Sequence, residues 1–166
     1  LCVSIAFWFV GFGIAVNIED VPTYFFWQKV AHVGVTFTGP LYVYFTLELL
    51  HMRNVRWLSY LYDAAAVVFY GLICTTNLYF SGEVIRYPWG LYPKATPLLT
   101  AHAILTVVCL LSCYPLFFQA CRRARQHGRQ EAYNRLKYLC VALIIFAFAP
   151  IDYLPKYGIN IYPFGY

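Results

Sequence analysis

Four ionisable residues within long apolar stretches are the strongest candidates for chemistry: Lys29, His32, His102 and Asp152. An ionisable group near the middle of a membrane helix costs at least about 2.5 kcal/mol, so it usually faces a bundle interior, pairs with another group or serves a function. Lys29 and His32 are three residues apart and share a helix face. Imidazoles titrate near neutral pH. We therefore predict one cavity lined by these four side chains, with Lys29 and Asp152 as candidate ion-pair partners and a proton or a small anionic ligand as the stimulus.

Two residues between the apolar stretches complete the predicted ligand-binding set. Asn77 follows one apolar segment directly, and Trp89 lies in a loop rich in proline, glycine and aromatic residues. A second interpretation of the whole set stays open. In it these groups form helix-to-helix hydrogen bonds, and the amine of Lys29 reaches toward the membrane surface.

Catalytic and cofactor motifs are missing from the sequence. It contains no Ser/His/Asp set, no HExxH and no glycine-rich phosphate loop. Cys109 and Cys113 are four residues apart on one predicted helix face. They could hold a metal ion there or serve as small packing residues. We predict no catalytic residue, no metal and no cofactor.

The composition places most of the chain in lipid. Of its 166 residues 61% are hydrophobic and 11% are charged, against about 25% charged in a typical soluble domain. A membrane span needs about 20 apolar residues. Five segments qualify or nearly so, which predicts an all-α polytopic transmembrane bundle; they are residues 1–16, 24–50, 57–76, 96–120 and 138–154.

The connections between these segments alternate in charge. Arg53 and Arg56 lie in one connection, and a strongly basic stretch runs from Arg122 to Lys137 in another. Basic loops face the cytoplasm, so we expect these two inside and residues 77–95 outside. That outer segment is predicted to be ordered without regular structure. Because these basic residues lie next to apolar spans, they indicate the membrane topology and contact with anionic lipid headgroups. Binding of nucleic acid is the less favoured interpretation.

Several segments resemble the N-terminal seven-transmembrane region of bacterial histidine kinases. The resemblance covers nearly the whole chain and rests on these stretches: 26–34 with Pro40, 76–82, 87–90, 92–95, 151–158 and 161–165.

That resemblance implies a signal-input module with seven spans and a cytoplasmic output domain in cis. The five spans here would make residues 1–166 a single sensor-type domain truncated at both ends, in the bacterial inner membrane. A homodimer is a candidate assembly. The output domain would be a histidine kinase, or a related one such as a diguanylate cyclase, and no kinase motif lies within this chain. A transporter or a membrane enzyme subunit is the alternative that the intramembrane histidines and aspartate leave open, and a purely structural subunit is a third.

Overall fold

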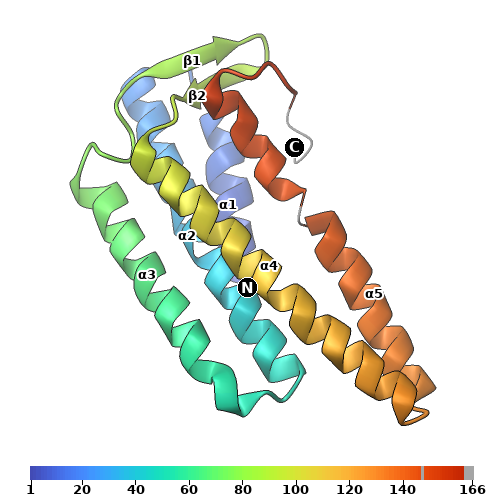
Figure 1. The fold of residues 1–166 in the computed structure, drawn as a ribbon. Helices are drawn as coiled ribbons and strands as arrows, with labels where there is room; N and C mark the ends of the chain where they lie inside the picture. The colour runs from blue at the N-terminus through green and yellow to red at the C-terminus, as the bar shows by residue number, and fades with distance from the viewer. Residues whose placement is uncertain (147, 163–166) are drawn as a thin grey trace.

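The computed structural model describes residues 1–146 and 148–162, and it is a bundle of α-helices (Figure 1). The helices are α1 (Cys2–Ala15), α2 (Val21–Leu49), α3 (Arg56–Thr75), α4 (Pro97–Gln126) and α5 (Gln130–Phe146). Short 3-10 segments flank them, η1 (Arg53–Val55) before α3 and η2 (Ala149–Tyr157) after α5. The predicted all-α membrane fold is confirmed. The end of the last resembling stretch, residues 163–165, lies outside the described residues.

Among the described residues, three helical segments are long and apolar enough to cross a membrane: Arg53–Thr75, Pro97–Gln126 and Gln130–Tyr157. The apolar helix α1 is shorter. Helix α2 is 29 residues long and lies centrally, packed against α1, α3 and α4. Because its neighbours cover it, α2 can carry buried polar residues that a lipid-facing helix could not.

Capping residues set where two of the helices begin. Asp20 accepts a hydrogen bond from the Thr23 amide at the start of α2. Thr96 does the same for the Leu99 amide at the start of α4. Each cap is followed within two residues by a proline, which is well tolerated in a first helical turn because its missing N–H would have no partner there.

The basic stretch between α4 and α5 is mostly helix, so its description as a loop is wrong. Helix α4 continues to Gln126 and α5 begins at Gln130. Arginine, glutamine and lysine are good helix formers, and Arg135 pairs with Glu131 one turn earlier, at 2.5 Å. Gly128 provides the turn with a left-handed φ of 67°.

The segment between α3 and α4 contains a β-hairpin, which corrects our prediction that it lacks regular structure. Strands β1 (Val84–Tyr87) and β2 (Gly90–Pro93) are antiparallel, with Tyr87 opposite Gly90. β-Branched and aromatic residues in these strands favour extended structure. Gly90 has a φ of 145°, and a side chain there would meet the Val16 carbonyl oxygen at 3.4 Å.

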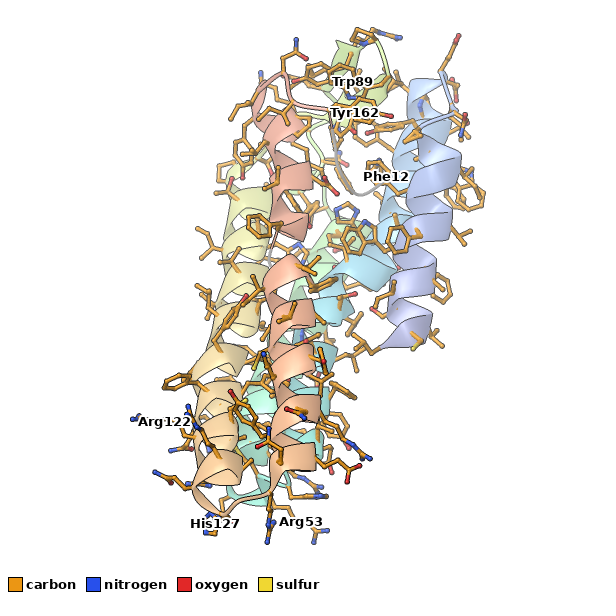
Figure 2. The ribbon with its side chains drawn as sticks, turned by 90° about the vertical axis from the view of Figure 1, so that its right-hand side faces the viewer. Phe12, Arg53, Trp89, Arg122, His127 and Tyr162 are labelled. Atoms are coloured by element: carbon orange, nitrogen blue, oxygen red, sulfur yellow. The ribbon has the colours of Figure 1, made fainter. Side chains whose placement is uncertain are left out.

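The two basic connections lie at the same end of the bundle. Figure 2 shows Arg53, Arg122 and His127 at one end, called here the basic end, and Trp89 and Tyr162 at the other, the hairpin end. This is the arrangement that alternating helices produce, and it agrees with the alternation of charge along the sequence.

Candidate ligand-binding site

Tyr79, in the loop after α3, is the centre of a buried polar cluster near the hairpin end. Its side chain is fully buried, and its hydroxyl lies 2.7 Å from Nδ1 of His102 on α4. Its backbone carbonyl accepts a hydrogen bond from the Thr96 hydroxyl at 3.0 Å, which holds the loop against the start of α4. Burial raises the pKa of the Tyr79 hydroxyl well above its ordinary range. The hydroxyl is therefore neutral at physiological pH.

His32 on α2 packs against the other side of Tyr79. The two rings meet edge to face with centroids 5.2 Å apart, and the Phe80 ring contacts the same imidazole at 5.1 Å. Nδ1 of His32 lies 2.6 Å from the Gln28 carbonyl oxygen. A carbonyl can only accept, so this nitrogen carries the proton, and Nε2 of the neutral ring is an acceptor.

Both imidazoles keep one ring nitrogen without a hydrogen bond. Nε2 of His32 and Nε2 of His102 are buried and have no partner among the described residues. The Tyr153 hydroxyl beside them is also buried and has no hydrogen-bond partner among the described residues. Buried polar groups are almost always hydrogen-bonded, so three such atoms in one region indicate a place that a ligand or water can satisfy.

The segment η2 completes the cluster with two charged residues. Lys156 and Asp152 are both buried, and they are close enough to interact electrostatically. The Lys156 amine lies 4.3 Å from the centre of the Tyr153 ring and also interacts electrostatically with both histidines. The Tyr79 cluster, as we use the term, is the set His32, Tyr79, His102, Asp152 and Lys156.

The structure brings three of the six predicted site residues together. His32, His102 and Asp152 belong to the Tyr79 cluster. Lys29 is half-buried on α2, without a hydrogen bond or ion pair among the described residues, so the pair with Asp152 does not form. Asn77 is exposed beyond α3, and Trp89 lies in the hairpin turn, stacked on Tyr87 at 5.0 Å.

Two members of the cluster were missed by sequence reasoning. Tyr79 is one of 16 tyrosines, and nothing marks it as the one that turns inward. Lys156 follows the last predicted span and looked like a loop residue. One signal was available, because Asp152 and Lys156 are four residues apart and could share a helical face.

The cluster is packed rather than hollow, unlike the cavity that we predicted. The rings of Tyr79 and Phe80 pack directly against His32. A small void of about 20 Å³, which Tyr153 helps to line, lies nearby, and this is room for about one water molecule. A larger ligand would have to displace aromatic side chains.

Hydrogen bonds tie η2 to the hairpin end above the cluster. The Ala95 amide donates to the Lys156 carbonyl at 2.8 Å, and the Tyr87 hydroxyl donates to the Pro155 carbonyl at 2.9 Å. The Tyr157 hydroxyl lies 2.8 Å from the Thr100 hydroxyl and donates to it. Any displacement of the cluster on its η2 side therefore has to strain or break contacts with the hairpin or α4.

Comparison with known proteins identifies a family that covers the whole chain. The model of a family described as the N-terminal 7TM region of histidine kinase matches residues 1–166. No curated protein and no solved structure matches the chain.

Proposed function

Because the chain belongs to the family of N-terminal seven-transmembrane regions of histidine kinases, we propose that it is a membrane-embedded signal-input module and that the Tyr79 cluster is its input site. In this proposal the basic end faces the cytoplasm and the hairpin end faces outside, as the positive-inside rule requires. A cytoplasmic output domain in the same protein reads the signal. The family's region is distinct from the catalytic part of a kinase.

The observation that carries the proposal is the pair of unpaired imidazole nitrogens on either side of Tyr79. Leaving a buried polar atom without a partner costs about 1–3 kcal/mol. Each histidine has a hydrogen-bond partner at Nδ1, and a ligand that bonds to the two Nε2 atoms would satisfy the remaining buried nitrogens. His32 Nε2 needs a donor from that ligand while the ring is neutral.

The chemistry of the cluster favours a small polar or anionic ligand. Lys156 lies near both histidines, and an amine can donate several hydrogen bonds. A ligand with an acidic or acceptor group would be attracted by Lys156.

A path from the cluster to the basic end runs through the last helical segment. Asp152 and Lys156 belong to η2, which follows α5 in the chain, and α5 begins beside the basic turn at Gly128. The change from α-helix ending at Phe146 to 3-10 helix from Ala149 is a feature often found at hinges. A ligand that separates Tyr79 from His102 would move η2 and, through it, α5. Pro40, inside α2, and Pro150 are further candidate hinges.

The test uses the intact protein with its natural output domain in proteoliposomes. In His32→Asn and His102→Asn the amide can replace Nδ1, while the unpaired Nε2 is lost. For the double variant we expect basal output, measured as autophosphorylation, to change at least threefold with the melting temperature within about 3 °C of the wild type.

A matched control removes one hydrogen bond outside the cluster. Thr75→Val deletes the hydrogen bond to the Gly71 carbonyl at the exposed end of α3, away from the cluster and from η2, and should leave output unchanged. Wild-type output from the double histidine variant, at any melting temperature, would show that the cluster is structural and not the input site.

A further inference from the structure

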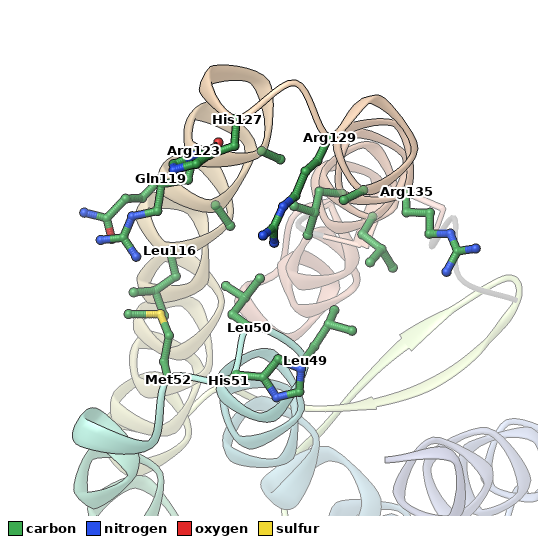
Figure 3. Close-up of a pocket in the computed structure, with 15 residues that line it drawn as sticks. Leu49, Leu50, His51, Met52, Leu116, Gln119, Arg123, His127, Arg129 and Arg135 are labelled. Carbon is green, nitrogen blue, oxygen red and sulfur yellow. Dashed lines mark hydrogen bonds between the residues drawn. The ribbon is translucent and has the colours of Figure 1, made fainter.

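An open groove at the basic end has a different chemical character from the Tyr79 cluster. It has a volume of about 680 Å³ and lies between the end of α2, the last turns of α4 and the start of α5 (Figure 3). Its apolar lining includes Leu50, Met52, Leu116, Leu136 and Leu139. Two sides of the groove are helices that continue into the membrane, so this lining is continuous with the lipid-facing surface.

The charged side chains around this groove are all basic. Arg123, Arg129 and Arg135 line it together with His51 and His127, and no acidic residue does. Figure 3 shows Arg129 reaching over the groove toward Leu50, whereas Arg135 points away from it. Arg135 pairs with Glu131 at 2.5 Å. Arg123 and Arg129 have no ion pair among the described residues.

The groove lies at the ends of two segments that are long and apolar enough to cross a membrane. It lies where the membrane-crossing segments Pro97–Gln126 and Gln130–Tyr157 meet at their basic ends. Guanidinium groups bind phosphate through two parallel hydrogen bonds, and anionic lipids attract basic residues placed at this level. The leucine side chains below offer a surface to an acyl chain.

We propose that this groove binds one anionic phospholipid, with its phosphate on Arg123 and Arg129 and an acyl chain along the leucines of the floor. The charge and the apolar floor are both needed for this assignment. A groove of similar size at the hairpin end contains an acidic residue, Glu83, which pairs with Lys94 at 2.7 Å. Its remaining basic residues, Arg86 and Lys156, lie beside the short apolar side chains of Val84, Ile85 and Ala95, and no leucine lines it.

Two arginines at the same end of the bundle provide a matched control. Arg53 lies in η1 and Arg56 at the start of α3, and neither lines the proposed groove. Arg53→Gln/Arg56→Gln therefore removes two positive charges from the basic end, as Arg123→Gln/Arg129→Gln does, but leaves the proposed site intact.

The first measurement is native mass spectrometry of the intact protein with equal amounts of phosphatidylglycerol and phosphatidylcholine. We expect the wild type to retain phosphatidylglycerol preferentially. Arg123→Gln/Arg129→Gln should reduce that preference about tenfold, because each basic group contributes to the attraction. The Arg53/Arg56 control should stay within twofold of the wild type. An equal loss in both variants, or no preference in the wild type, would overturn the proposal.

Two further experiments distinguish a bound lipid from other occupants of the groove. Soluble glycerol 3-phosphate should not displace the bound lipid; displacement would make this a site for free phosphate groups. Phosphatidylglycerol with a photoactivatable acyl chain should label peptides that contain Leu50, Met52 or Leu116, and the label should fall in Arg123→Gln/Arg129→Gln. A zero-length cross-link from these peptides to another segment of the protein would instead show that protein fills the groove, and the proposal would fail.

Discussion

The Tyr79 cluster and the basic groove use similar residue types in opposite ways. In the cluster, imidazole, ammonium and carboxylate groups are buried and held by contacts with Tyr79, Tyr153 and one another. In the groove, guanidinium groups are exposed around an open apolar floor. The cost of charge explains the difference, since it is high in the bundle interior and low at the headgroup level. We therefore expect substitutions that break a hydrogen bond of the cluster to change stability as well as output, and substitutions at the groove to change lipid preference alone.

The largest expected effect comes from the close packing of α1 on α2 in the buried part of the bundle. In Gly34→Ala the new methyl group would overlap the Ser4 carbonyl oxygen and the Trp8 amide nitrogen. We predict that the free energy of unfolding falls by about 3 kcal/mol, because the backbones of α1 and α2 would have to separate. Thermal unfolding in detergent measures it. Gly13→Ala, where nothing lies within 4 Å, is the control, and similar melting temperatures for the two variants would contradict the packing described here.

Loss of the Tyr79 hydroxyl should give the next largest loss of stability. Tyr79→Phe leaves Nδ1 of His102 without its partner, and we predict a loss of about 1–3 kcal/mol. Tyr157→Phe removes a hydroxyl of the same kind on the surface and should cost less than about 1 kcal/mol. Chemical denaturation of both variants tests this. Equal losses of stability in the two variants would mean that the Tyr79 hydrogen bond contributes no more than the one on the surface.

A third prediction concerns the helices that form the basic end. The sulfur atoms of Cys121 and Cys140 are 3.9 Å apart, on α4 and α5, and a bond between them requires only a small approach. Copper phenanthroline should form this disulfide and stabilise the fold by about 1–2 kcal/mol. Peptide mapping by mass spectrometry identifies it. Cys109 and Cys113, on one helix, should stay reduced, and a mapped 109–113 bond instead would contradict the helix packing.

The smallest expected effect is at the exposed start of α2. Hydrogen bonds from the Thr23 hydroxyl and amide lower the pKa of Asp20 from its ordinary value of 3.8. A lowered carboxyl pKa adds stability above pH 4 that is lost as the pH falls through the folded-state pKa. Asp20→Ala should therefore lower the melting temperature by about 2 °C at pH 7, and the difference should shrink at pH 3. A constant difference would show that charge plays no part.

Several features of this protein followed from its sequence because lipid is a restrictive solvent. A chain in a bilayer has to satisfy its backbone within helices, so apolar length located α1 to α4 and the second half of α5. Alternating charge placed Arg53 and Arg122 at the same end. Helical rise is constant, so His32, His102 and Asp152 were expected at similar depth, and all three are in the cluster.

Only the tertiary structure decided which side chains meet. Depth along a helix says nothing about rotation around its axis or about how a loop folds, and these determined that Lys29 lies apart while Tyr79 and Lys156 enter the cluster. The β-hairpin and the basic groove likewise depend on contacts between segments far apart in the chain. Such contacts form wherever packing and hydrogen bonding are best satisfied together, and local residue patterns do not contain that information.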